Sequence, residues 1–208
     1  MLEFELQQYL LHEYPQENAC CEWKEFKNLK NSFCGDEKND VISYVSAIAN
    51  MEGAHLLVGV KDKTLEIVGT DISRLTFNGQ PANTQSATFK LTEQLTYLSS
   101  EGLSIAEFVT EDSGKRVWII HIPKHLPRRP VLAHKKAWQR IEDSLVEMTN
   151  ERMSVILEEP IYIIIPQKCY LAFLKNFFLT QMLDDFSNNP FVFVNMLIMG
   201  MFCYLFDD

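Results

Sequence analysis

The sequence predicts an α+β fold, in which a single domain with a mixed sheet and flanking helices is followed by an apolar C-terminal tail. Segments with helical and strand-like patterns occur in mixed order, whereas a parallel α/β fold would show strict alternation. The composition, 47% hydrophobic and 23% charged, is that of a globular protein. A change in composition after Pro160 separates a domain over residues 1–159 from a tail over residues 160–208. At 208 residues the chain has room for one ordinary domain and an appendage.

The first part of the domain is expected to hold two helices and three strands. An imperfect apolar stripe predicts a helix over residues 2–12. Alternating polar and aromatic residues predict a strand over 22–27. Capping residues and a regular apolar face predict a helix over 36–50. The apolar run 55–60 and the β-rich run 65–69 are predicted to form a hairpin.

The second part continues in the same mixed order. An amphipathic helix is expected over residues 84–98. Two strands over 104–110 and 116–123 flank Asp112-Ser113-Gly114, whose residue types suit a tight turn. A short strand is expected over 138–141, and Thr149 is expected to open the last helix.

Charge and motifs exclude several classes of protein. The net charge of -9 rules out a globally basic nucleic-acid-binding protein, although a local basic face is still allowed. The sequence lacks the glycine-rich phosphate loops of ATPases and dinucleotide-binding proteins, and the common hydrolase signatures. Five cysteines without a CxxC pair argue against a disulfide framework or a zinc site. The N-terminus does not resemble a secretory signal, so we expect a cytoplasmic protein.

Three acidic residues are placed where strands are expected to begin and end. Glu17 and Glu22 stand five positions apart before and within the strand 22–27, and Asp62 follows the strand 55–60. If these strands are neighbours, the three carboxylates meet at one edge of the sheet. Carboxylate oxygens bind Mg²⁺ or Mn²⁺, and such an ion activates water for phosphate cleavage. Solvated surface acids are the alternative interpretation of the same pattern.

A second cluster is basic and runs from Lys115 to Arg152. It holds nine basic and four acidic residues, a local excess of +5, and histidines and Trp138 are interspersed. This composition suits contact with phosphates and stacking on bases, and an ordinary solvated face is the alternative. The candidate nucleic-acid-binding residues are Lys24, Lys124, Arg128, Arg129, Lys135, Lys136 and Arg140.

The tail differs from the rest of the chain. Residues 161–208 carry eight of the fourteen phenylalanines, and Pro190–Phe206 is uncharged over seventeen residues, close to the length that spans a bilayer. Asn195 and Gly200 interrupt this stretch, and no Lys or Arg flanks it. The alternatives are a membrane anchor, a buried helix that completes the core, a shortened product with a non-native end, and a surface for homo-oligomerisation.

Taken in order, these motifs resemble a known family. The segments Glu17-N-A-C-C-Glu22-W-K-E-F-K, H-L-L-V-G-V-K-D, R-R-P-V-L and W-Q-R-I-E-D-S are similar to those of the Schlafen AlbA-type DNA-binding domain, over about residues 12–155. The resemblance implies an α+β domain that binds nucleic acid, either DNA or RNA. In some Schlafen members it also implies a metal-dependent endoribonuclease, whose acidic residues match Glu17, Glu22 and Asp62 here.

One departure from the family pattern affects the loop before the strand 55–60. The family has two glycines where this chain has Gly53-Ala54. Alanine resists backbone angles that glycine accepts, so we expect the substitution to be tolerated if residue 54 has a negative φ.

Overall fold

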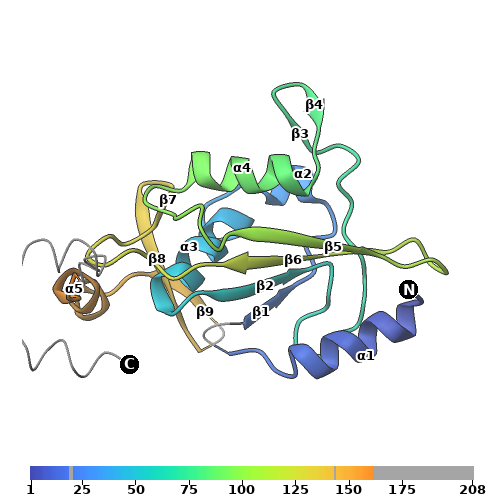
Figure 1. Ribbon diagram of the computed structural model, residues 1–208, viewed down its shortest axis with the longest axis horizontal. Helices are drawn as coiled ribbons and strands as arrows, with labels where there is room; N and C mark the ends of the chain where they lie inside the picture. The colour runs from blue at the N-terminus through green and yellow to red at the C-terminus, as the bar shows by residue number, and fades with distance from the viewer. Residues whose placement is uncertain (19–20, 143, 162–208) are drawn as a thin grey trace, which may run out of the picture. The chain divides into compact units, whose positions relative to one another are not determined.

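A four-stranded mixed sheet forms the centre of the computed structural model, which describes residues 1–18, 21–142 and 144–161. The strand order is β1 (Cys21–Lys24), β2 (Ala54–Val58), β6 (Arg116–Ile122) and β5 (Ser104–Val109) (Figure 1). β1 is parallel to β2, whereas β2 with β6 and β6 with β5 are antiparallel. The predicted α+β class is therefore confirmed. These residues belong to one compact unit, Met1–Ile161, and the remainder of the chain, with the apolar stretch Pro190–Phe206, lies outside the described residues.

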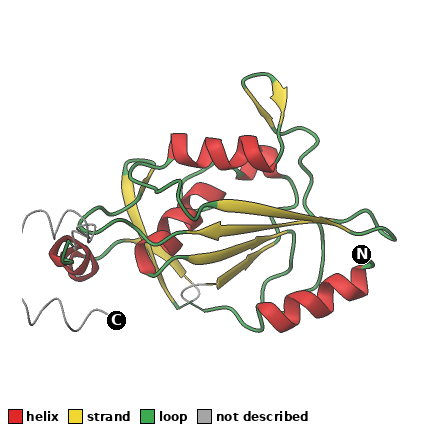
Figure 2. Ribbon diagram, viewed as in Figure 1, coloured by secondary structure: helices red, strands yellow, loops and turns green. Residues whose placement is uncertain are grey.

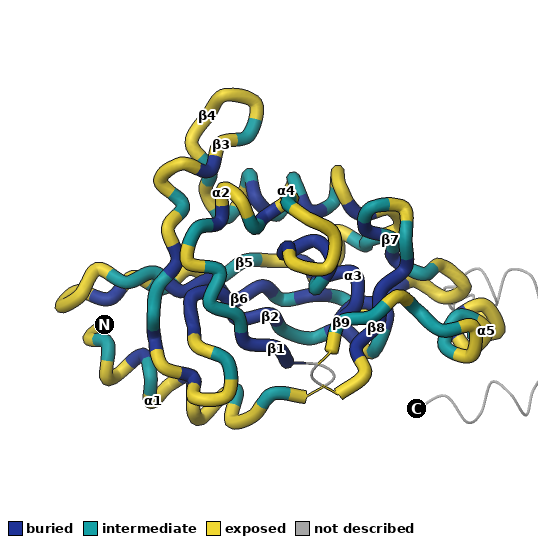
Figure 3. Tube along the Cα trace, turned by 180° about the vertical axis from the view of Figure 1, so that it is seen from behind, coloured by how far each residue is buried: buried dark blue, intermediate teal, exposed yellow. Residues whose placement is uncertain are grey.

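Helices cover both faces of this sheet (Figure 2). α3 (Val41–Met51) and α4 (Thr84–Gln94) pack on one face, where their apolar side chains join Leu56, Trp118 and Ile120 in the larger core. α1 (Glu3–Glu13) covers the other face, where Leu6 and Leu10 pack on sheet residues such as Leu57 and Ile119. Figure 3 shows the result, with the central strands buried and the outer segments of the chain exposed.

A second, smaller sheet packs against α3. It has the antiparallel order β7 (Leu132–Ala133), β8 (Lys136–Ile141) and β9 (Ser144–Glu147), and β8 lies along the helix. The remaining elements are α2 (Leu29–Ser32), β3 (Thr76–Phe77), β4 (Gln80–Pro81) and α5 (Asn150–Glu158). No helix within the described ranges is long and apolar enough to cross a bilayer.

Several predicted elements differ from the structure at their ends. The strand predicted over 22–27 stops at Lys24, because Phe26 takes a positive φ of 30° that ends the extended conformation. The predicted strand 65–69 is wrong: only Ile67 makes a bridge, to Val60. Leu65 and Ile67 instead bury their side chains in the smaller core, which explains why this loop is apolar.

Buried polar side chains join α3 to the second sheet. Asp40 caps the start of α3, where its Oδ1 accepts a hydrogen bond of 3.0 Å from the Ser43 N–H. At the other end, the Asn50 amide donates to the carbonyls of Val131 and Trp138, and its Oδ1 accepts from the Val131 N–H at 2.7 Å. Because Asn50 is fully buried, these bonds replace the water that its amide loses on folding.

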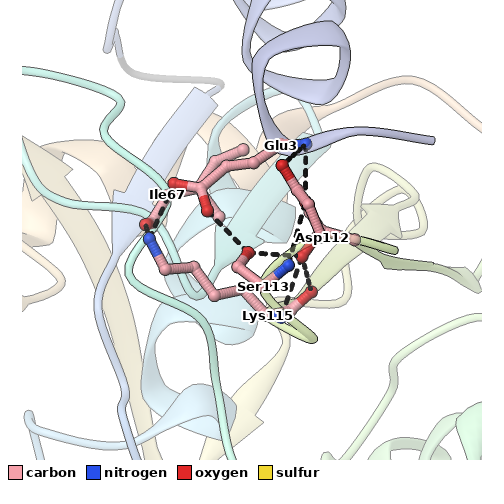
Figure 4. Close-up of polar contacts among 6 residues, drawn as sticks. Glu3, Ile67, Asp112, Ser113 and Lys115 are labelled. Atoms are coloured by element: carbon pink, nitrogen blue, oxygen red, sulfur yellow. Dashed lines mark hydrogen bonds and ion pairs between the residues drawn. The ribbon is translucent and has the colours of Figure 1, made fainter.

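The first turn of α1 is held by the turn between β5 and β6 (Figure 4). The N-cap residue of α1, Leu2, has no side-chain acceptor, and Asp112 supplies one by accepting from the Glu3 N–H at 3.1 Å. The Glu3 carboxylate accepts from the Ser113 hydroxyl at 2.6 Å and pairs with Lys115 Nζ at 2.7 Å. A negative charge beside the N-terminus of a helix is also favourable for the helix dipole.

Ala54 has a φ of +128°, a region that favours glycine. The condition for an unstrained alanine at this position, a negative φ, is therefore not met. The chain keeps a glycine at the preceding position, Gly53, where an added Cβ would lie 2.6 Å from the backbone nitrogen of Lys124. The close approach of the 122–124 backbone fixes the conformation of this loop, and Ala54 is therefore held at a φ that is strained for alanine.

Candidate functional site

The structure brings the three predicted acidic residues to one edge of the sheet. Glu22 lies on β1 and Asp62 lies in the loop after β2, and Lys24 at the end of β1 contacts both carboxylates. Glu17 lies in the loop before β1. Its Oε1 accepts from the Trp23 N–H and its Oε2 from the Lys63 N–H, both at 3.2 Å. This carboxylate therefore ties β1 to the loop after β2.

Lys24 lies between the other two carboxylates. Its Nζ is 2.7 Å from Glu22 Oε1 and 2.6 Å from Asp62 Oδ2, and it lies 5.3 Å from the centre of the Tyr44 ring. The second oxygen of Glu22 pairs with Arg140, whose side chain is 2% exposed. Arg140 also donates from NH1 to the carbonyl of Asn18 at 2.7 Å.

Burial and pairing have opposite effects on the ionisation of this cluster. Burial raises the pKa of Glu22, and the nearby charges of Lys24 and Arg140 oppose that shift. Burial lowers the pKa of Lys24, but its bonds to Asp62 and Glu22 outweigh this effect and raise that pKa above its ordinary value. With two cations on one carboxylate, the arrangement favours a charged Glu22 and a charged Lys24 at neutral pH.

The arrangement does not fit a bound Mg²⁺ or Mn²⁺. The ammonium of Lys24 occupies the position between Glu22 and Asp62, and both oxygens of Glu17 accept backbone hydrogen bonds. Throughout the described part of the chain, no group of three or more His, Cys, Asp or Glu side chains is placed to hold a metal ion. The metal-site prediction for Glu17, Glu22 and Asp62 thus gains no support from the geometry.

The seven predicted basic residues do not form one face. Lys24 and Arg140 belong to the acidic site, and Arg140 is too buried to reach a phosphate, which differs from the prediction. Lys136 pairs with Glu37, near the start of α3. Lys124 pairs with both Glu52 and Glu159 at 3.1 Å, near the opposite end of that helix.

Within the described part of the chain, three of the seven are exposed and make no ion pair. Arg128 donates from Nε to the carbonyl of Glu159 at 3.0 Å. Arg129 and Lys135 are exposed, and among the described residues neither has a carboxylate within ion-pair distance. Among the seven predicted residues, these three side chains are therefore the positive charges that stay available to a partner.

Tyr97 lies beside this exposed charge, and sequence reasoning missed it. The Arg129 guanidinium lies 5.8 Å from the centre of the Tyr97 ring, and Tyr97 is 51% exposed. The two segments are joined by reciprocal hydrogen bonds of 3.0 Å between Thr96 and Leu132. Tyr97 has a φ of +68°, which is uncommon for a bulky residue and often marks a functional position.

The sequence also matches a model of a known protein family. The family is described as Schlafen, AlbA_2, and the match covers residues 17–149, more than half of the chain. The chain belongs to the Schlafen AlbA_2 family. The matched region contains the acidic site together with Tyr97, Arg128, Arg129 and Lys135. The family resemblance inferred from the sequence motifs is thus confirmed.

Comparisons of the Schlafen AlbA_2 chain with other proteins gave weaker matches. No curated protein matched the sequence. The DIP2311 protein from Corynebacterium diphtheriae is 16% identical with a TM-score of 0.42, and the match covers 70% of this chain and 30% of that one. The N-terminal domain of a RecG-related protein from Nitrosomonas europaea is 17% identical with a TM-score of 0.30, covering 60% and 74% of the two chains.

Proposed function

We propose that this Schlafen AlbA_2 domain binds nucleic acid, with Arg128, Arg129 and Lys135 contacting phosphates and Tyr97 stacking on an unpaired base. The observation that carries the proposal is the exposed pair of Arg129 and Tyr97, because the guanidinium is held by an aromatic ring and not by a carboxylate. A planar cation beside an aromatic ring is the arrangement with which proteins bind phosphates and bases together.

The ion pairs of Lys124 and Lys136 also support a binding site at Arg129 and Tyr97. A phosphate that approaches Lys124 or Lys136 has to compete with Glu52, Glu159 or Glu37 for the ammonium group. At Arg129 no such competition exists within the described residues. In a chain of net charge -9, binding is therefore expected where an exposed cation has no carboxylate partner and also lies beside an exposed aromatic ring, as Arg129 does beside Tyr97.

Binding is measured by fluorescence anisotropy with labelled single-stranded and duplex RNA and DNA, over a range of salt concentrations. We expect Arg129→Gln to weaken binding and to lower the slope of log K against log salt by about 0.7–0.9, the contribution of one phosphate contact. Tyr97→Ala is expected to weaken single-strand binding by about 1–3 kcal/mol. It should have a much smaller effect on duplex binding, where bases are stacked and covered.

Two exposed residues elsewhere provide matched controls. Arg74→Gln removes an exposed arginine from the loop before β3, and Phe89→Ala removes an aromatic side chain that is 68% exposed on α4. Both variants should bind like the wild type. The proposal is wrong if the wild-type protein binds none of the four nucleic acids at low salt, or if the controls lose as much affinity as the Arg129 and Tyr97 variants.

The endoribonuclease alternative is tested with the same RNA in the presence of Mn²⁺ or EDTA. Asp62→Asn is the suitable variant, because Asp62 is 44% exposed and its removal leaves the buried pair of Glu22 and Arg140 in place. Cleavage that requires Mn²⁺ and disappears in Asp62→Asn would establish a nuclease. Salt-sensitive binding without cleavage would leave a binding domain.

A further inference from the structure

Two histidines face each other on the side of the sheet that α1 covers. His55 on β2 and His121 on β6 are directly opposite in the antiparallel register, so their side chains point to the same face. Their ring centres are 4.8 Å apart, and the ring planes meet at 81°. Neither ring makes a hydrogen bond or ion pair with any residue that the structure describes, so the fold leaves their ring nitrogens available.

His55, one member of the pair, borders an open space in the protein. Tyr14, just after α1, packs its ring edge-on against His55 at 5.0 Å and fixes one side of the pair. Next to it is a cavity of about 230 Å³, lined by residues that include Tyr14, Cys21 and His55. A cavity of this size has room for an ion with several waters.

The spacing of the rings suits metal coordination. With a Zn–N distance of about 2.0–2.1 Å, two imidazoles on one tetrahedral ion have ring centres about 5 Å apart. A neutral imidazole binds a metal ion through a ring nitrogen, and no hydrogen bond to a described residue occupies the ring nitrogens of either histidine here.

We propose that His55 and His121 form a two-histidine chelate for a divalent transition-metal ion such as Zn²⁺ or Ni²⁺. Within the described ranges no third His, Cys, Asp or Glu converges on the pair, so water fills the other coordination positions. Imidazole favours these ions over Mg²⁺ and Mn²⁺. The chelate is thus separate from the acidic site and does not depend on nucleic-acid binding.

The test is isothermal titration of the full chain with Zn²⁺ under reducing conditions, for the wild type, His55→Gln, His121→Gln and the double variant. The matched control is His12→Gln, because His12 is 84% exposed on α1. We expect one strong equivalent in the wild type and in the control. Each single variant should bind at least tenfold more weakly, and the double variant no more weakly than the singles, because a chelate requires both rings.

Unchanged affinity in either single variant would overturn the proposal, and so would an equal loss in His12→Gln. Titration with Co²⁺ adds a check, since an intense near-ultraviolet charge-transfer band would show that cysteine thiolates bind the ion instead. If the far-UV circular dichroism shows that a glutamine variant is unfolded, the proposal is tested on the wild-type protein by NMR. In its proton NMR spectrum Ni²⁺ should first broaden two histidine signals together, and broadening of only one signal would contradict the chelate.

Discussion

Arg140→Met is expected to destabilise the domain strongly without affecting nucleic-acid binding by the folded protein. The side chains of Arg140 and Glu22 are 2% and 1% exposed, so the variant leaves a buried carboxylate without one of its two cations. Removing one partner of a buried ion pair costs about 3–5 kcal/mol. Lys24 still contacts Glu22, and the carbonyls of Asn18 and Cys21 keep backbone N–H donors, which favours the lower end of that range.

Urea denaturation measures the loss, and a second substitution identifies its cause. Glu22→Leu in the Arg140→Met background removes the stranded charge, so the double variant should lose clearly less stability than the two single variants together. We expect a coupling of about 2 kcal/mol or more, within the range measured for residues in contact. Nucleic-acid affinity, measured on the folded fraction, should stay at the wild-type value for Arg140→Met.

The pH dependence provides an independent check. Loss of Arg140 removes a cation that lowers the pKa of Glu22, so the pKa of this buried carboxyl rises further in the variant. Between the unfolded and the folded pKa, the folded variant binds more protons than the unfolded chain, and its stability therefore increases as the pH falls. The difference in the free energy of unfolding between the wild type and Arg140→Met should decrease from pH 7 toward pH 4. A wild-type urea midpoint combined with weaker nucleic-acid binding would refute the buried pair and place Arg140 on the surface.

Three further changes test other features of the fold. Ala54→Gly should stabilise the domain by about 1 kcal/mol, because the φ of +128° strains alanine; a lower melting temperature would contradict this. Asp112→Ala removes the acceptor that caps α1 and should cost about 1 kcal/mol, with faster amide exchange in the first turn of α1; unchanged exchange there would argue against this cap. Asn50→Ala should cost about 3 kcal/mol in urea unfolding, because buried groups of Val131 and Trp138 lose their partners, and a loss below about 1 kcal/mol would show that water replaces the amide.

Local patterns predicted the elements that are regular and amphipathic. The apolar face of α3 and the turn residues between β5 and β6 are both encoded within short segments. The β5–β6 hairpin occurs where it was expected, and α3 begins at Val41, five residues later than the start of the predicted helix over 36–50. The meeting of Glu22 and Asp62 followed from one topological assumption, that their strands are neighbours, and β1 does pair with β2. Parallel pairing requires a crossover connection, which α3 supplies, and the sequence predicted a helix between the two strands but not their orientation.

Long-range contacts account for what the sequence did not reveal. The sequence around Arg140 resembles that around Lys136 and suggests an exposed side chain for both. Arg140 is buried only because β8 approaches Glu22. Tyr97 was expected inside a helix over 84–98. The helix stops at Gln94, and the bond between Thr96 and Leu132 then turns Tyr97 outward. Neither contact has a local signal, since each joins residues more than thirty positions apart.

The strand order has a consequence for synthesis on the ribosome. β2 lies between β1 and β6, and its Leu56, Leu57 and Val58 are fully buried in the finished sheet. The strand β6 is translated only after β3, β4, α4 and β5, so β2 has one open edge until then. At about 5–20 residues per second, this delay lasts several seconds. We therefore expect the nascent chain to bind chaperones such as trigger factor or Hsp70 during this interval, and to be released when the β5–β6 hairpin closes the sheet.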